Sequence, residues 1–311
     1  MPTSLQNPGL VYLADKAIIA AAAEIACIKD FCWSLSDQAI QPGTTMKVNL
    51  FDSAPARVFN RETNNYETVD GTVTQAEISF DTHLKKTFMF TDKDFLLVNV
   101  AVWDQAGEAG GVALAQAILS AISDKINKTN IPKSGPCATG GTFGAANEYV
   151  LATATKKTVA KLRKAARAAG IAPRRSVLAL CPDHYADILA ELDSHIYNGD
   201  EAVRLGRIPG LYGFKSVVEM EMNDGEGENL VGAVIPDQAI GIAGRAIEVQ
   251  SPSNYQEVGM TVDEGSGLPI TIRRHGSPKY GENFVNMETL FGGALLQANK
   301  IVRLVSSATA A

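Results

Sequence analysis

TVTQAEISFDTHLKKTFMF, residues 72–90, is a stretch in which apolar and polar side chains alternate. A period of two residues is typical of a β-strand with one apolar face and one hydrated face. The stretch therefore predicts one long strand. Its apolar face comprises Ala76, Ile78, Phe80, Leu84, Phe88 and Phe90.

A second extended run, MKVNLFDSAPARVF at residues 46–59, precedes this strand. The segment between the two, NRETNNYETVDG, is polar and carries the turn signals Asn64-Asn65 and Asp70-Gly71. Together they predict a β-hairpin over residues 46–91, with strands far longer than the usual length of about 5–6 residues. A lone two-stranded ribbon is marginally stable in water, so its apolar face needs a partner surface.

The composition is that of an ordinary globular protein. The chain has 311 residues, 46% of them hydrophobic and 20% charged, with a net charge of -6. A protein that reads DNA sequence usually has a basic face, so this acidic balance disfavours that class. The four cysteines, at 27, 32, 137 and 181, form no Cys-x-x-Cys pair. We expect them to be free thiols in a reducing compartment.

The segment KAIIAAAAEIAC, residues 16–27, imitates an export signal, but Glu24 interrupts its apolar run. Ile18, Ala21, Ile25 and Ile28 recur at helical spacing and predict an amphipathic helix instead. No stretch reaches the about 18 apolar residues that a membrane span requires, so we expect no membrane contact.

The rest of the chain mixes helices and strands. Apolar spacing predicts a long helix over 104–128, a basic helix over 155–169, a buried strand over 176–181 and a helix from Pro182. The last third is strand-like and punctuated by glycine. This order predicts an α+β fold.

Few residues in the sequence indicate chemistry. The glycine-rich stretches lack nucleotide-binding contexts, and the four histidines lack metal-ligand spacing, so we expect no cofactor and no metal. Cys181, Asp183 and His184 meet at a strand-to-helix junction and are a candidate thiol site. A buried cysteine and a helix-capping aspartate explain the same residues. The basic helix either contacts phosphates or is a solvated face.

A series of motifs follows the hairpin in order: ISFDTHLKKTFMFTDKDF, APRRSVLALCPDHYADIL, GRIPGLYGFKSVVEM and NFVNMETLFGGALLQANKIVRLV. In this order they resemble the tailed-phage major capsid (coat) proteins of the Hong Kong 97-type fold, over nearly the whole chain. The resemblance implies an N-arm (1–45), an extended hairpin or E-loop (46–91), a P-domain (92–175) with a spine helix (104–128), an A-domain (176–258) and closing strands (259–311).

The resemblance further implies a non-enzymatic structural subunit that assembles into pentamers and hexamers of an icosahedral shell. The shell would enclose a double-stranded DNA genome without sequence-specific binding, in a virion made in the host cytoplasm. Expected partners are a portal protein, a separate scaffolding protein and a decoration protein. The intersubunit face would be Ala76, Ile78, Phe80, Leu84 and Phe88 of the hairpin.

Two alternatives stay open at this point. An encapsulin-type compartment shell shares the fold but encloses cargo protein. An enzyme of a different class would depend on Cys181 and His184.

Overall fold

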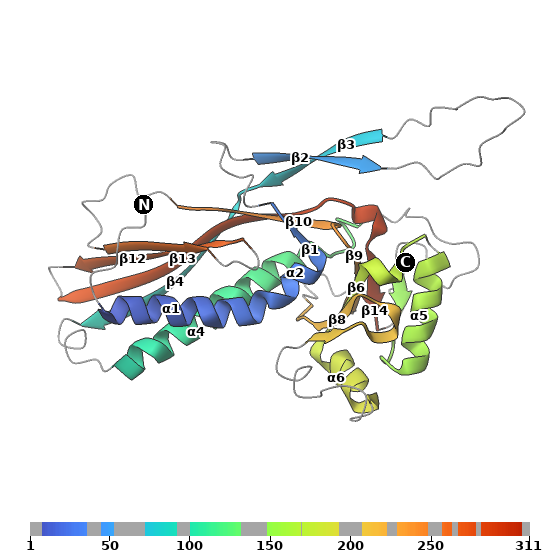
Figure 1. The fold of residues 1–311 in the computed structure, drawn as a ribbon, viewed down its shortest axis with the longest axis horizontal. Helices are drawn as coiled ribbons and strands as arrows, with labels where there is room; N and C mark the ends of the chain where they lie inside the picture. The colour runs from blue at the N-terminus through green and yellow to red at the C-terminus, as the bar shows by residue number, and fades with distance from the viewer. Residues whose placement is uncertain are drawn as a thin grey trace, which may run out of the picture.

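The computed structural model describes most of the 311-residue chain. The described residues are 8–35, 45–52, 72–91, 100–131, 148–168, 170–192, 207–222, 229–247, 257–262, 267–277 and 281–306. They form helices, two six-stranded sheets and one two-stranded sheet, a mixed α and β architecture (Figure 1).

The first sheet is organised around β13 (Glu282–Leu295), the longest described strand. One side of β13 pairs antiparallel with β12 (Pro269–Ser277) and then with β10 (Ile240–Arg245). Its other side pairs with β4 (Thr82–Thr91). The remaining strands are β1 (Cys32–Ser34), parallel to β10, and β11 (Glu257–Val262), antiparallel to β12.

Helices α1 (Pro8–Glu24) and α4 (Val100–Ser123) lie side by side against this sheet (Figure 1). Their backbones touch at glycines four residues apart on α4. A Cβ atom on Gly111 would lie 2.2 Å from the carbonyl oxygen of Ala17, and one on Gly107 would lie 2.5 Å from that of Leu13. Only glycine permits this approach, because a backbone oxygen cannot move aside as a side chain can. The short helices η1 (Ile25–Cys27) and α2 (Ile28–Phe31) then lead into β1.

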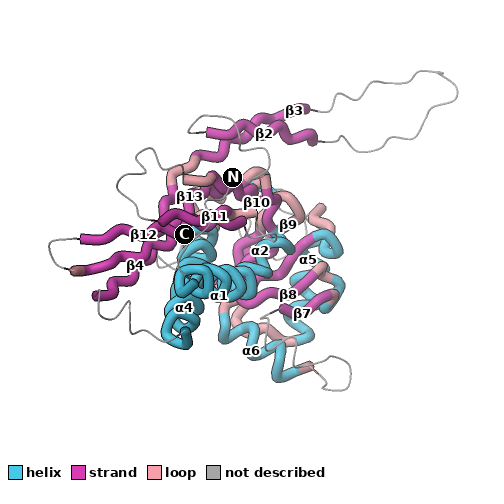
Figure 2. Tube along the Cα trace, turned by 60° about the vertical axis from the view of Figure 1, so that its left-hand side comes forward, coloured by secondary structure: helices cyan, strands magenta, loops and turns pink. Residues whose placement is uncertain are grey.

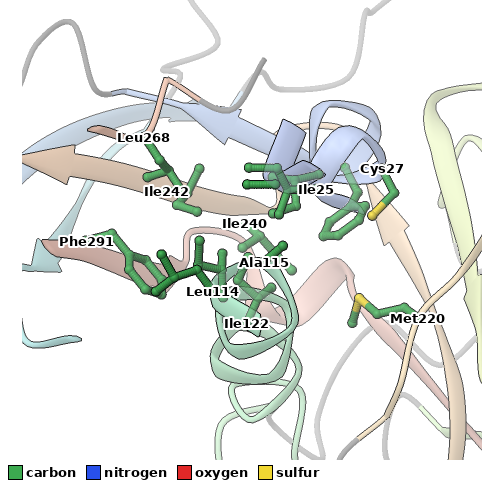
Figure 3. Packing of buried hydrophobic residues seen from close by; sticks show 14 of the residues in the cluster. Ile25, Cys27, Leu114, Ala115, Ile122, Met220, Ile240, Ile242, Leu268 and Phe291 are labelled. Carbon is green, nitrogen blue, oxygen red and sulfur yellow. The ribbon is translucent and has the colours of Figure 1, made fainter. Parts of the chain in front are cut away.

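The main core lies between α4 and this sheet and continues onto the other six-stranded sheet through Val177, Val218 and Ile235. Figure 3 shows Leu114, Ala115 and Ile122 of α4 beneath the strands that carry Ile242 and Phe291. The Val102–Ser123 part of α4 is long and apolar enough to cross a membrane by length and composition alone, and 44% of its most apolar stretch is buried. Because α4 packs on both α1 and the first sheet, it is a core helix of the part of the molecule that is built around that sheet.

The second sheet has the order β5-β14-β9-β6-β8-β7. Helices α5 (Lys156–Ala168) and α6 (Pro182–Glu191) pack against it and share a separate apolar core with it. The strands are β5 (Glu148–Val150), β6 (Ser176–Leu180), β7 (Arg207–Pro209), β8 (Ser216–Glu219), β9 (Leu230–Pro236) and β14 (Val302–Val305). Single turns of helix complete the described elements: η3 (Pro173–Arg175), η4 (Leu211–Gly213) and η6 (Ala298–Lys300).

A two-stranded hairpin stands off the body. Its strands, β2 (Thr45–Asp52) and β3 (Thr72–Ser79), pair antiparallel with Val48 opposite Ala76 and Met46 opposite Ile78. Both views place these strands above the first sheet (Figures 1 and 2). The predicted hairpin tip, residues 53–71, lies outside the described residues.

The prediction of one continuous strand over 72–90 is wrong. The strand ends at Ser79, and β4 begins at Thr82 and pairs with β13 instead of β2. The hairpin of 46–91 is therefore shorter than expected. The alternation could not show this break, because Ala76, Ile78, Leu84 and Phe88 keep the same parity on both sides of it.

Other boundaries differ by a few residues. The helix expected over 104–128 runs from Val100 to Ser123, and the amphipathic helix expected at 16–27 begins eight residues earlier, at Pro8. The helices expected at 155–169 and from Pro182 are α5 and α6. Because β5 and α5 share the core of the second sheet with β6, the expected boundary between residues 175 and 176 runs through a single cluster.

Candidate functional site

The predicted intersubunit face is divided between two parts of the structure. Ala76, Ile78 and Phe80 pack in a small cluster at the root of the hairpin, together with Val48 and Leu50. Leu84 and Phe88 lie on β4 and pack against the main core. The predicted residues thus share an apolar face, but most of that face already has partners within the subunit.

Ile78 is the most enclosed of these residues. It is 0% exposed and packs with Leu35, Ala243 and Leu296, which come from the first sheet and its surroundings. The hairpin and β13 approach so closely that a Cβ on Gly292 would lie 2.1 Å from the carbonyl oxygen of Ser79. The apolar face therefore anchors the hairpin to its own body, and Ile78 is not exposed in the isolated subunit as a free intersubunit contact would be.

The opposite face of the hairpin is open to solvent. It carries an ion pair between Lys47 and Glu77 (3.3 Å) and a hydrogen bond from Gln75 to Asn49 (3.4 Å). On the same face Val73 is 63% exposed. Exposed pairs such as Lys47–Glu77 contribute little stability. This face is polar along its middle and has the cross-strand pair Phe51 and Val73 near the end of the described strands.

The candidate thiol site is assembled by the start of α6. Cys181 directly follows the second-sheet strand β6 and is the N-cap of α6, and His184 lies in the first turn of that helix. The Cys181 sulfur lies 3.2 Å from Nδ1 of His184, and Nε2 of His184 lies 3.1 Å from the carbonyl oxygen of Leu151. A proton on Nε2 donates to that carbonyl, which holds the ring with Nδ1 toward the sulfur.

Both groups of this pair have shifted pKa values. Partial burial raises the pKa of the Cys181 thiol, but hydrogen bonding to His184 and the charge of His184 outweigh it, and the net pKa lies below its ordinary value. The hydrogen bond to Cys181 raises the pKa of His184, which partial burial opposes, and the net pKa lies above its ordinary value. Proton transfer from Cys181 to His184 gives a thiolate and an imidazolium. The thiolate is the nucleophilic form of cysteine.

Cys181 and His184 reach each other although they lie only three residues apart in the chain. Residues i and i+3 come together when the first of them caps a helix, as in a capping box. Asp183 is exposed in the same first turn, where its charge suits the helix dipole.

In the described part of the chain, no group of three or more His, Cys, Asp or Glu side chains is arranged to hold a metal ion. The expectation of no metal and no cofactor for the whole chain stays a prediction. A polar network that sequence reasoning missed surrounds Asp30, which is 5% exposed. Its carboxylate accepts hydrogen bonds from Arg207 (Nη2, 2.7 Å) and Ser216 (2.9 Å), and Lys215 donates to its backbone oxygen (2.7 Å).

Comparison with solved structures gives whole-chain matches. A protein of Gordonia phage Cozz matches with a TM-score of 0.52 and 14% identity, over 92% of this chain and 87% of that chain. A virus-like particle from Pyrococcus furiosus matches with a TM-score of 0.51 and 12% identity, over 94% and 97%. The capsid structure of cyanophage P-SCSP1u matches with a TM-score of 0.50 and 13% identity, over 89% and 87%.

No protein-family model and no curated protein sequence matches this chain. At identities of 12–14%, the structural likeness shows the fold. The chain therefore has a fold found in a phage capsid and in a virus-like particle, and it spans that fold nearly from end to end.

Proposed function

We propose that this protein, built on the fold of phage capsid subunits, is the major capsid protein of a tailed phage. Its role is structural and non-enzymatic: copies of the chain form pentamers and hexamers of an icosahedral shell that encloses double-stranded DNA. The observation that carries the proposal is the extent of the match. The likeness to the cyanophage capsid covers 89% of this chain and 87% of that one, so no large part of either fold is left over.

The finer architecture belongs to the same proposal. The hairpin of β2 and β3 corresponds to the E-loop, α4 to the spine helix of the P-domain, and the second sheet with α5 and α6 to the A-domain. The projecting hairpin in Figures 1 and 2 supports this assignment, as does the second apolar core, whose members all belong to the second sheet, to α5 and α6, and to their connections. In the virion, the shell would contact a portal protein, a separate scaffolding protein and a decoration protein.

The intersubunit face needs revision within this proposal. The expected face was Ala76, Ile78, Phe80, Leu84 and Phe88. Because Ile78 is fully buried and Leu84 and Phe88 pack on the subunit's own core, these residues hold the hairpin and β4 in place. The contact with a neighbouring subunit then falls to the outer hairpin face, where Val73 is exposed.

The test is the size of the particles that the purified chain forms. We expect closed shells or capsomers of megadalton mass in size-exclusion chromatography and electron microscopy. Cys181→Ala is the matched control, because a structural subunit without that thiol should assemble with nearly unchanged yield. A stable small oligomer whose turnover of an electrophilic substrate requires Cys181 would replace the shell with a thiol enzyme. The 3.2 Å approach of Cys181 to His184 is the observation that favours this rival.

A second candidate within the same fold is an encapsulin-type compartment shell. The likeness to the virus-like particle from Pyrococcus furiosus, at a TM-score of 0.51, is as close as the likeness to the phage structures. The contents of purified particles distinguish the two. Encapsulated double-stranded DNA supports the phage capsid, whereas a stoichiometric cargo protein without DNA supports the compartment.

A further inference from the structure

One segment of this acidic chain is strongly basic. Residues 149–182 contain eight Lys and Arg side chains and no Asp or Glu, although the whole chain has a net charge of -6. Most of this charge is on α5 and on the turn that follows it. The six basic side chains of α5 are all exposed: Lys156, Lys157, Lys161, Arg163, Lys164 and Arg167.

A pocket of about 500 Å³ lies at the C-terminal end of α5. Arg163 and Arg167, four residues apart on the helix, line it together with Arg174 of the following turn. Its other lining residues are small or apolar: Gly170, Ile171, Ala172 and Pro173. Three arginines thus line one cavity whose volume is typical of small-ligand sites.

The three arginines have no partner within the described residues. No ion pair or hydrogen bond joins Arg163, Arg167 or Arg174 to a described carboxylate. Elsewhere in the fold arginines do pair, as Arg207 does with Asp30 and Arg175 with Asp237 (4.0 Å). The described part of the subunit therefore supplies no counter-charge to these three arginines.

The backbone at the pocket is held in place by a helix-ending motif. The Ile171 N–H donates to the Ala166 oxygen (3.0 Å) and the Gly170 N–H to the Arg167 oxygen (3.1 Å), with Gly170 in the left-handed region at φ +78°. This is the Schellman arrangement, and it satisfies two of the carbonyl groups at the end of the helix. The partial negative charge of the helix end, about half a unit, is small beside three guanidinium charges.

Arg163 is positioned from a second side. A Cβ on Gly213, in the η4 turn, would lie 2.6 Å from Cζ of Arg163, so the guanidinium group packs flat against this glycine. Gly213 has φ +79°, and the lack of a side chain there leaves the room that Arg163 occupies. Packing against Gly213 therefore holds Arg163 in place. The other two arginines of the pocket are Arg167, on the same helix, and Arg174, on the turn that follows it.

We propose that this pocket binds a phosphate group, with the nucleic-acid backbone as its main source. Guanidinium groups form paired hydrogen bonds with phosphate oxygens. A single side-chain carboxylate would leave two of the three arginines without a counter-charge, whereas a polynucleotide brings successive phosphates to the three arginines of the pocket. The inference rests on the pocket and not on the proposed shell, so subunits that form no particles still test it.

The test is fluorescence anisotropy of a labelled DNA oligonucleotide with the full chain, over a series of KCl concentrations. We expect Arg174→Gln and Arg167→Gln each to weaken binding about fivefold or more, and to reduce the slope of log affinity against log salt by about 1. Lys157→Gln is the charge-matched control on the same helix outside the pocket lining, and it should leave the slope unchanged. Circular dichroism checks that each variant is folded.

Competition with inorganic phosphate separates the sources. If phosphate binds in calorimetry with the same dependence on Arg174 but DNA does not bind, the pocket takes a small phosphate compound. Three results overturn the proposal: neither probe binds, Lys157→Gln has the same effect as Arg174→Gln, or a polyglutamate peptide binds through Arg174 as tightly as DNA. An equal effect of Lys157→Gln would indicate only a diffuse positive field around α5. Tight binding of polyglutamate would indicate an acidic protein partner.

Discussion

At the scale of single residues, Cys181 and His184 show how a helix start creates a reactive environment. The N-cap position of Cys181 puts its sulfur beside the imidazole one turn on, and the Leu151 carbonyl orients that ring from its far side. A shell subunit does not need such a pair. The local geometry suffices to form it, because the capping turn brings residues i and i+3 together.

The thiols should therefore differ sharply in reactivity. In a Cys137→Ser background, we expect iodoacetamide at pH 7 to alkylate Cys181 about tenfold or more faster than Cys27 and Cys32. Burial raises the pKa of Cys27 to about 12 and also raises that of Cys32, whereas the pKa of Cys181 is lowered overall. Since thiolate is the reacting form, the rate at Cys181 should rise with pH through a midpoint below that of free cysteine. Peptide mass spectrometry measures each site.

His184→Ala is the control for this prediction. Without the imidazole, the burial of Cys181 is unopposed, so the midpoint of its pH–rate profile should move upward. An unchanged profile in the variant would show that the contact with His184 does not set the thiolate population.

At the scale of elements, the hairpin of β2 and β3 has two faces that differ in their contacts. The inner face, with Val48 and Ile78, packs on the subunit's own sheet, and the outer face, with Val73, is open. Burial of a Val or Ile side chain contributes about 1.5–3 kcal/mol, so the inner face accounts for the attachment of a ribbon that would be marginal alone.

Substitutions on the two faces should have opposite effects. Ile78→Asp places an unpaired charge in a closed apolar cluster, so we expect it to cost about 3–5 kcal/mol and release the hairpin from the body. Hydrogen exchange of the β2 and β3 amides in the unassembled subunit should become much faster. Val73→Asp should leave the free energy of unfolding within about 0.5 kcal/mol of wild type but lower the yield of particles.

Ser79→Asp adds the same charge at an exposed hairpin position and should be tolerated in both measurements. If Val73→Asp assembles as well as Ser79→Asp, the outer face near Val73 is not an intersubunit contact. If Ile78→Asp leaves hydrogen exchange unchanged, the packing of the inner face does not hold the hairpin.

At the scale of the whole molecule, the two sheets are joined by the main apolar core, which includes Val177, Val218 and Ala233 of the second sheet, and by the Asp30 network. Asp30 lies in α2, which connects α1 to β1 of the first sheet. Its partners Arg207 and Ser216 belong to β7 and β8 of the second sheet. Lys215 adds a bond to the Asp30 backbone and an ion pair to Asp237 (3.4 Å). These contacts set how one body is oriented on the other.

Asp30→Asn should weaken this junction. The amide keeps the shape but removes the charge that pairs with Arg207. Breaking a fully buried pair costs about 3–5 kcal/mol, but the Arg207 side chain is 40% exposed and retains water, so we expect a loss of about 2 kcal/mol. Urea unfolding of the unassembled subunit measures it. Lys29→Gln, at the exposed neighbouring position, should change stability by less than about 0.5 kcal/mol, and an equal loss in both variants would argue against the network.

The sequence by itself determined the elements whose periodicity is long and whose ends are marked. The basic helix with Thr155 before it and Gly170 after it appears as α5, and the buried run from Ser176 appears as β6. Such signals are local, because each records how one face of one element meets water or protein. The order of the motifs also pointed to the capsid fold.

Only the tertiary structure decided which strand each face meets. Alternation at residues 72–90 is the same whether Leu84 packs on a hairpin partner or, through β4, on the core under β13, so the pattern could not reveal the break after Ser79. Likewise, Asp30 and Arg207 are far apart in the chain, and Arg174 joins Arg163 only after the turn at Gly170. Periodicity reports that a side chain is buried, but its partner is chosen by long-range packing, which local sequence does not encode.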